Sequence, residues 1–293
     1  MSQVEAFRVP VDVDLRGFTT LLRALGIAHR VVESNDAQVV WVLDVHSAEE
    51  VRALYAAHPD GAEPESVEVS ERMQARLARR RSVKEQLTDN PATTAMLMLT
   101  LLAALFTGFG DQFSTIRWLS FLDFRIQDQY LYFAPIEYTL TSQLWRLVTP
   151  MFIHFGFLHL AMNSLWYWEL GKRIEARHGA LALVGLSLVF SVIANIAQYT
   201  YGGASLFGGL SGVLYGLLGY CWIYQKISPN SIFRLPPGVV GMMLIWLVVC
   251  MTGVVGALGF GAIANAAHVG GLLAGCGFGA IAGVLSRGRG QRA

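Results

Sequence analysis

Ser211 is the residue of this sequence whose surroundings best fit covalent chemistry. It lies between Gly208–Gly209–Leu210 and Gly212, inside a largely apolar stretch. Glycines on both sides of a serine permit a tight turn into a helix and let a second backbone approach closely. The N–H of Ser211 then points out of the helix N-terminus, where it can stabilise an oxyanion. Glycine and serine are also common packing residues of membrane helices, so this motif indicates catalysis only together with a base.

His268 is the base that the sequence offers. It lies in the run of small residues 264–271, which lets its helix come close to a neighbouring one. Burial favours the neutral imidazole, which can accept a serine proton, although a packed histidine bonded to a carbonyl is the alternative. No carboxylate in the apolar stretches is placed to complete a triad, so we predict a dyad. Tyr215, four residues after Ser211, shares its helix face and can pack against the imidazole ring.

His159 and Asn163 are the candidate oxyanion donors. They are four residues apart, which places them on one face of a helix. Both side chains can donate the hydrogen bonds that an oxyanion hole requires, although they can equally tie helices together. His154 lies five residues before His159, a poor pairing on a helix, and we expect it to have that tying role. Further polar residues without an assigned role lie in the apolar stretches: Asn195, Gln198 and Asn265.

The elements that must position these residues are membrane helices. The chain is 54% hydrophobic and only 15% charged, whereas soluble domains carry roughly a quarter charged residues. A spanning helix needs about 20 mostly apolar residues. Six stretches meet this requirement: 92–110, 147–168, 180–201, 203–225, 236–258 and 261–285. From Ser211 to the polar residue Gln225 a helix covers only about 22 Å, so we expect irregular backbone before Ser211 and a water-filled pocket opening outward.

Charge placement predicts the orientation. Lysine and arginine gather before the first stretch, after the second and fourth, and in the C-terminal tail, which places both termini in the cytoplasm. The connection 111–146, called the first loop below, is dense in tryptophan, tyrosine and phenylalanine. Aromatic side chains suit the membrane–water interface, so we expect this loop to be partly embedded.

The N-terminal part has a different composition. Residues 1–60 predict a small soluble α/β domain, with strands at 9–13, 27–33 and 38–45 and helices at 14–26 and 47–58. Residues 61–90 form a charged juxtamembrane linker whose basic run suits anionic headgroups. Residues 91–287 form the six-helix domain and 288–293 a basic tail. The charged residues near the start interrupt any signal-peptide core.

Other chemistries leave recognisable motifs. Three cysteines in apolar runs form no disulfide framework and no metal site. A zinc protease needs His-Glu-x-x-His, and none of the seven histidines precedes a glutamate. Residues 108–111 match the GxGD string of intramembrane aspartyl proteases, but no other stretch supplies the second aspartate, so Asp111 is interpreted as the polar end of its helix. The net charge of +1 gives no indication of nucleic-acid binding.

The combined motifs resemble those of rhomboid intramembrane serine proteases of the bacterial type. The resemblance covers about residues 92–285 in the family's order, and residues 1–60 resemble the small cytoplasmic domain of that type. It is carried by the following matches: Trp145–Arg146, His154, His159, Asn163, Gly209–Leu210–Ser211–Gly212, Tyr215, Ala267–His268, Gly271 and Gly275.

The resemblance implies a six-helix bundle with a Ser211–His268 dyad that opens toward the periplasm. It implies an oxyanion hole from His159, Asn163 and the Ser211 backbone, with Gly209, Gly212, Tyr215 and His154 in support. The loop around 256–262 would cap the site, and the fifth span with Trp246 would gate substrate entry. Pro150 departs from the pattern, since some bacterial members have a histidine there.

The expected function is therefore an intramembrane serine endopeptidase of the bacterial inner membrane, acting on transmembrane protein substrates without metal or organic cofactor. The alternative is an inactive protein of the same fold that binds and delivers membrane clients. Inactive members are expected to lack the serine or the histidine, and both are present here. A transporter is disfavoured, because the stretches show no repeated half and no charged pathway.

Overall fold

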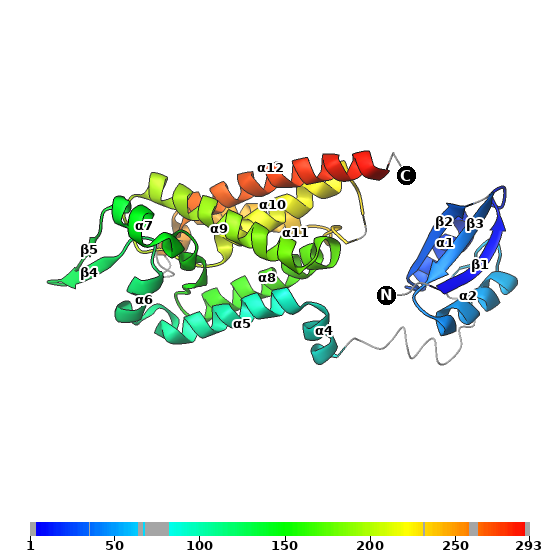
Figure 1. The fold of residues 1–293 in the computed structure, drawn as a ribbon, viewed down its shortest axis with the longest axis horizontal. Coiled ribbons are helices and arrows are strands. Elements are labelled where there is room, and N and C mark those ends of the chain that lie inside the picture. Colours follow the sequence, from blue (N-terminus) through cyan, green and yellow to red (C-terminus); the bar gives the residue numbers. More distant parts are fainter. Residues whose placement is uncertain are drawn as a thin grey trace. The chain divides into compact units, whose positions relative to one another are not determined.

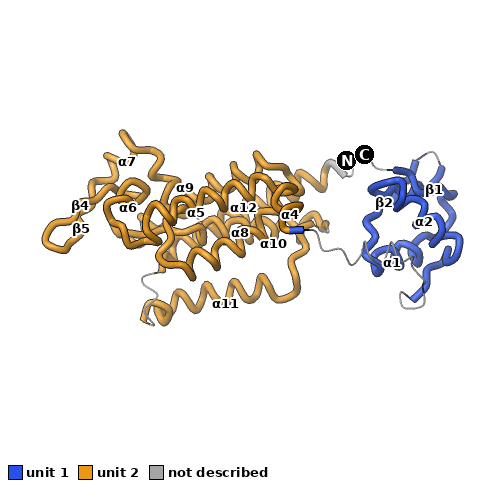
Figure 2. The backbone as a smooth tube through the Cα atoms, turned by 90° about the horizontal axis from the view of Figure 1, so that it is seen from below, with its two compact units in different colours: residues 1–82 blue, residues 83–293 orange. Residues whose placement is uncertain are grey.

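The computed structural model of the 293-residue chain describes residues 4–34, 36–63, 67, 82–230, 232–257 and 263–290. The chain divides into two compact units, Met1–Ser82 and Val83–Ala293 (Figures 1 and 2).

The first unit is a small α/β domain. Its strands form an antiparallel sheet in the order β1-β3-β2, and its helices pack against the sheet around Phe18, Leu22, Val40 and Val51, all fully buried. Its elements are β1 (Val4–Pro10), α1 (Arg16–Ala24), β2 (His29–Ser34), β3 (Ala37–Val42) and α2 (Val45–Ala57). The side chain of Asp44 caps α2 by accepting the backbone N–H of Ser47.

The first strand is misplaced in the sequence-based prediction of 9–13. Strand β1 ends at Pro10, where the predicted strand would have continued. Pairing with β3 runs from Val4 to Pro10. Proline has no N–H to donate to a ladder, which suits the last position of the strand.

The second unit is mainly helical (Figure 1). Its helices and strands are α4 (Val83–Asp89), α5 (Pro91–Phe106), α6 (Phe113–Leu119), β4 (Phe124–Gln127), β5 (Tyr130–Phe133), α7 (Ile136–Ser142), α8 (Phe157–His178), α9 (Ala180–Gly202), α10 (Ser211–Ile227), α11 (Val239–Met251) and α12 (Asn265–Gly290). Among the residues that the structure describes, three short 3₁₀ helices join them: η2 (Gly108–Gly110), η3 (Leu144–Leu147) and η4 (Thr149–Phe152).

The apolar helices mark an integral membrane protein. By length and composition, α9 and α12 can each cross a bilayer, and the pair α4 and α5, bent by 103°, could form a third span. Helix α11 is apolar but shorter, with 13 residues where 236–258 was expected. These counts refer to the residues that the structure describes.

The predicted second stretch, 147–168, is wrong in its boundaries. Helix α8 covers Phe157–His178, and the residues before it form η3, η4 and a short extended segment. Hydropathy alone could not reveal this. Pro150 fits a 3₁₀ turn, and Gly156, at a φ of 92°, breaks the chain direction just before α8. At its other end α8 continues into a charged segment that an apolar window excludes.

Buried glutamate and threonine side chains join α8 to the start of α5. Glu175 on α8 accepts the backbone N–H groups of Ala92 and Thr93 at 2.8 Å each, and the Thr93 hydroxyl at 2.7 Å. A carboxylate at a helix N-terminus satisfies otherwise unpaired N–H groups and suits the helix dipole. Glu175 therefore fixes the beginning of α5 against α8.

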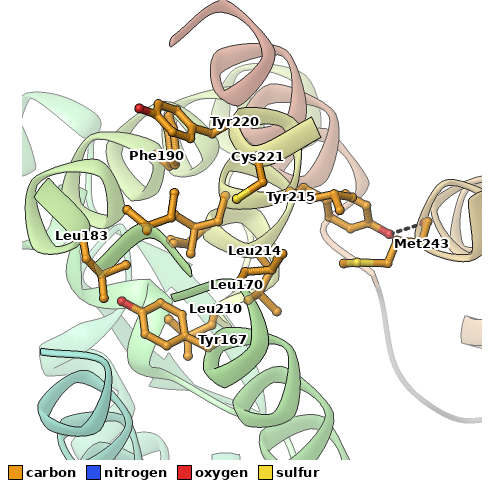
Figure 3. Packing of buried hydrophobic residues seen from close by; sticks show 14 of the residues in the cluster. Tyr167, Leu170, Leu183, Phe190, Leu210, Leu214, Tyr215, Tyr220, Cys221 and Met243 are labelled. Atoms are coloured by element: carbon orange, nitrogen blue, oxygen red, sulfur yellow. Dashed lines mark hydrogen bonds between the residues drawn. The ribbon is translucent and has the colours of Figure 1, made fainter. Parts of the chain in front are cut away.

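Helices α10 and α12 pack backbone to backbone through glycines. A Cβ on Gly271 would lie 2.0 Å from the Gly212 carbonyl oxygen, and one on Gly275 would lie 1.9 Å from the Gly216 carbonyl oxygen. Only glycine permits this approach. Large side chains between α8, α9 and α10, including Tyr167, Phe190 and Leu214, form much of the remaining core (Figure 3).

The first loop is an ordered structure built on Arg146. This side chain is 1% exposed, contacts the side chain of Gln143 and the carbonyl of Arg117, and donates to the Ser120 carbonyl at 2.8 Å. Asp123 accepts two hydrogen bonds from Arg117 and lies 3.6 Å from Arg146. Burial alone would raise the pKa of Asp123, but the hydrogen bond and charge of Arg117 and the charge of Arg146 hold that pKa below its usual value.

Parts of the sequence-based prediction fall outside the described residues. These are most of the basic run in the linker (68–81), most of the expected cap (258–262) and the end of the tail (291–293). Within the predicted linker the structure contains the short helix α4.

Candidate active site

The candidate nucleophile and base, Ser211 and His268, lie next to each other at the N-terminal ends of two helices. Ser211 is the first residue of α10, and His268 lies in the first turn of α12. The Ser211 hydroxyl oxygen is 2.7 Å from Nε2 of His268. At this distance the hydroxyl can donate a hydrogen bond to that nitrogen. His268 is 6% exposed and Ser211 is half-buried. The pair has the geometry of a nucleophile next to its base.

The imidazole of His268 is oriented by packing. The ring of Tyr215 lies with its centroid 5.0 Å from the imidazole centroid at an interplanar angle of 40°, so the contact expected from the four-residue spacing is present. Nδ1 of His268 is buried without a hydrogen-bond partner among the described residues. Among the described residues no carboxylate bonds to Nδ1 of His268, so within them Ser211 and His268 form a pair without a third, acidic member.

The two candidate oxyanion donors lie close to the serine because Gly209 has no side chain. Its φ is +119°, and a Cβ built on it would lie 2.8 Å from Nε2 of His159 and 3.5 Å from Nδ2 of Asn163. Both side chains of α8 therefore face the backbone just before Ser211. A side chain at residue 209 would occupy the space where they converge, which explains the glycine.

The protonation of His159 follows from its hydrogen bond. The backbone N–H of Phe155 donates to Nδ1 of His159 at 3.3 Å. A neutral imidazole has one donor and one acceptor nitrogen, so Nε2 carries the proton. The Nε2–Cε1 edge of this ring lies next to Gly209. Asn163 Nδ2 is buried and has no partner among the described residues, so it is a second donor directed to the same place.

His154 lies elsewhere than expected. It belongs to the extended segment before α8, is fully buried, and its Nδ1 contacts the Phe152 carbonyl at 3.1 Å. Its ring centroid lies 5.0 Å from that of His159. The argument that a five-residue separation is a poor pairing assumed one continuous helix, and that assumption is wrong because α8 begins only at Phe157.

Gly212 gives the serine helix its close neighbours. A Cβ on this residue would lie 2.7 Å from the Ala194 Cβ on α9 and 3.4 Å from the Ala267 carbonyl oxygen on α12. The residue after Ser211 is thus enclosed by two helices. This enclosure holds the N-terminus of α10 next to His268.

Trp246 lies on α11 and not on the packed part of the bundle. Its side chain is 56% exposed. Figure 2 shows α11 along one side of the helical unit, and Figure 3 shows Tyr215 reaching from α10 to it. The Tyr215 hydroxyl donates to the Met243 carbonyl at 2.9 Å, and the Asn265 amide donates to the Cys250 carbonyl at 3.2 Å.

Ser191 and Asn195 lie at the site and have no role in the sequence-based prediction. Ser191 and Asn195 lie one turn apart on α9 and donate to the carbonyls of Val148 and Leu147. Together with Ser211 they line a cavity of about 10 Å³. A single water molecule needs about 10–15 Å³. The polar type of Asn195 inside an apolar stretch was the only available signal, and it did not indicate a partner.

The fold and the site together define an integral membrane protein with a serine–histidine pair held among its helices. Residues 141–284 match the family described as Rhomboid domain, and residues 1–69 match the Rhomboid N-terminal domain. The rhomboid protease GlpG of Serratia proteamaculans (strain 568) is 44% identical over 131 residues, which cover 45% of each chain. The protein of the same name from Yersinia pestis (strain Pestoides F) is 32% identical over 183 residues, covering 62% of this chain and 59% of the relative.

This chain therefore carries both a rhomboid domain and the N-terminal domain of rhomboid proteins. The matched segments span about half of the length of these relatives, 45% and 59%.

Proposed function

We propose that this chain is an intramembrane serine endopeptidase that hydrolyses peptide bonds in the transmembrane segments of other membrane proteins. The observation that carries the proposal is the 2.7 Å separation between the Ser211 hydroxyl oxygen and Nε2 of His268. The similarity to proteins named rhomboid protease supports the same reaction class.

In the first step His268 takes the proton of the Ser211 hydroxyl as the oxygen attacks the scissile carbonyl carbon. The protonated imidazole then gives this proton to the leaving amine, and the acyl-enzyme remains on Ser211. Water, deprotonated by His268, attacks the acyl carbon and releases the second product. Packing against the Tyr215 ring holds the imidazole in line for both transfers, in place of a carboxylate.

The tetrahedral intermediate needs donors for its negative oxygen. We assign this role to the backbone N–H of Ser211, Nε2–H of His159 and the Asn163 amide. The support is that His159 has its proton on Nε2 and that the buried amide of Asn163 has no other partner in the described part of the chain. Donors that are already oriented stabilise charge without reorganisation during the reaction.

We propose that substrate segments enter from the lipid between α8 and α11, past Trp246. The scissile carbonyl must lose its helical hydrogen bond before Ser211 can attack it. Segments with glycine, proline or other weak helix formers near the cleavage site unwind at lower cost, so they are the expected substrates.

We further propose that α5 and α8 to α12 are six spans in a bacterial inner membrane, with both termini cytoplasmic. Lys172, Arg173 and Arg177 at the end of α8, and Arg234 before α11, support this orientation. Ser211 lies at the opposite end of α10 from Lys226. The site would then open toward the periplasmic side.

The test uses the full-length protein reconstituted in lipid vesicles with a single-span reporter substrate. Cleavage is expected for the wild type and a loss of at least about 10³-fold for Ser211→Ala and for His268→Ala. A fluorophosphonate probe should label the wild type and spare both variants. Undiminished cleavage by Ser211→Ala refutes the assignment.

The competing function is a non-catalytic protein of this fold that binds membrane clients. The two functions are distinguished by the reporter experiment and by probe labelling. Stable co-purification of the reporter with the wild type, without cleavage and without labelling, would favour client binding.

A further inference from the structure

The turn that precedes α8 is tied down at four consecutive residues, each to another part of the fold. The Asn195 amide donates to the Leu147 carbonyl at 2.9 Å, and the Ser191 hydroxyl donates to the Val148 carbonyl at 3.0 Å. The remaining two ties are the Thr149 hydroxyl to the Leu119 carbonyl at 2.8 Å and the backbone N–H of Gly209 to the Pro150 carbonyl at 3.0 Å. Residues 147–150, called the tethered turn, therefore connect α9 and the first loop to the backbone before Ser211.

Pro150 suits the tethered turn for a physical reason. It lies at the start of the 3₁₀ helix η4, where its fixed φ is already correct and its missing N–H is not needed. Its carbonyl accepts from both Ile153, at 3.1 Å, and Gly209. Both acceptor positions of this oxygen are thus used, so its direction is fixed.

The backbone at Gly208 and Gly209 is clamped between the tethered turn and α8. A Cβ on Gly208 would lie 2.7 Å from the Ile153 Cβ and 2.8 Å from the Pro150 oxygen. On the other side, Gly209 faces His159. Only Leu210 separates this clamp from Ser211.

We infer that Pro150 and Asn195 are positioning residues of the reaction. They hold the tethered turn, and through the Gly209 hydrogen bond they set the geometry of the oxyanion donors. The inference rests on the proposed function. It assigns a role to Pro150, the residue at which the sequence departs from some bacterial members of the family. This proline orients its own carbonyl through the backbone alone.

The experiment compares Pro150→Ala and Asn195→Ala with a matched control, Ser187→Ala. Ser187 lies on α9 two turns before Asn195, is fully buried and bonds to the Tyr167 hydroxyl at 2.9 Å, away from the tethered turn. Cleavage kinetics of a reporter substrate are measured for the full-length protein in vesicles, together with Tm. We expect kcat to fall about tenfold with KM unchanged in the first two variants, since small misplacements of catalytic groups have such effects. Ser187→Ala should lower Tm similarly and leave kcat within about twofold.

A double-mutant cycle with Asn163→Ala separates positioning from general destabilisation. If Pro150 acts through the oxyanion donors, Pro150→Ala should reduce kcat in the Asn163→Ala background by less than about threefold. The same tenfold loss in both backgrounds, or an equal loss in Ser187→Ala, overturns the inference. If Pro150→Ala does not fold, Asn195→Ala decides by the same criteria. A wild type without cleavage refutes the proposed function, whereas an active wild type with unaffected variants refutes only the positioning role.

Discussion

Helix α10, which begins with Ser211, has two very different neighbours. On one side α12 approaches it so closely that Gly271, Gly275 and Gly279 each face an α10 carbonyl oxygen at less than the normal Cβ contact distance. On the other side α11 reaches it through the Tyr215 hydroxyl and a few apolar side chains, of which Met243, Leu247 and Cys250 are buried. The two functional side chains lie on the tightly packed pair.

The difference separates two requirements of the proposed reaction. A nucleophile and its base must hold their geometry to a fraction of an ångström, and backbone-to-backbone packing resists displacement. A substrate that arrives from the lipid needs a neighbour that can move, and local opening is easiest where few groups are buried. We therefore expect perturbations of the α10–α12 contact to stop the chemistry, and perturbations of α11 to change only access.

The largest effect is expected from Gly275→Ala, with Gly277→Ala as the matched control. The new Cβ at residue 275 would lie 1.9 Å from the Gly216 carbonyl oxygen, whereas a Cβ at residue 277 would have no atom within 4 Å beyond its chain neighbours and its own helix backbone. The helices must separate in the first variant, and a shift of about 1 Å at the dyad can cost about 10²-fold in rate. We expect that loss, together with a lower Tm from overpacking, and wild-type values for Gly277→Ala. Equal effects of the two variants would contradict the close-packing argument.

The sequence was sufficient for the residues on this contact. Ser211, His268 and Tyr215 could be placed because a helix puts residues four apart on one face and because small residues indicate close approach. The span 180–201 agrees with α9 (Ala180–Gly202) to one residue, since a long apolar run between glycines is unambiguous. These are local properties that one segment carries by itself.

Other features depend on contacts between distant segments and could not be predicted. The ties from Ser191 and Asn195 to the tethered turn exist only once α9 lies beside it. The hairpin of β4 and β5 turns at Asp128 and Gln129 with φ of 49° and 68°, where the usual glycine signal is missing. The start of α8 depends on the backbone turn at Gly156, and a search for apolar stretches does not detect such a turn.

Thiol labelling gives the next largest effect and compares α11 directly with the packed helix α10. Cys221 on α10 is fully buried and Cys250 on α11 is 2% exposed, so a static structure offers both poorly to a reagent. If α11 opens locally while the packed helices do not, a membrane-permeant maleimide should modify Cys250 at least about tenfold faster than Cys221. Peptide mass spectrometry of the full-length protein over time measures both rates in one sample. Similar rates for the two thiols would show that α11 is held as firmly as α10.

Tyr215→Phe tests the attachment of α11 with a smaller change. The ring that packs on His268 stays, and only the hydroxyl that bonds to Met243 is removed. A buried hydrogen bond contributes about 1 kcal/mol, so the open form of α11 should become up to about fivefold more populated. We expect kcat/KM for a transmembrane substrate and the labelling rate of Cys250 to rise by up to that factor, with unchanged fluorophosphonate labelling of Ser211.

The control for this variant is Tyr220→Phe. Its hydroxyl also lies on α10 but bonds to Nε2 of His178 at 2.9 Å, away from α11. Tyr220→Phe should leave substrate cleavage and Cys250 labelling unchanged. A parallel loss of cleavage and of fluorophosphonate labelling in Tyr215→Phe would instead place the role of the hydroxyl at the dyad.

The smallest effect on substrate access is expected from a substitution in the first loop, at Asp123. The pH dependence of Tm tests the role of this residue. Because Arg117 and Arg146 hold the pKa of Asp123 below its usual value, the folded carboxylate is more acidic than the unfolded one. Its contribution to stability is complete above the unfolded pKa of about 4 and is lost as pH falls through the lower folded value. Asp123→Asn should therefore have a lower Tm than the wild type at pH 7, and the gap should close below about pH 4. At pH 7 the ratio of substrate cleavage to fluorophosphonate labelling should be the same in both proteins, because Asp123 fixes the first loop and does not contact α11. If this ratio rises in Asp123→Asn as it does in Tyr215→Phe, substrate access is controlled on both sides of the site.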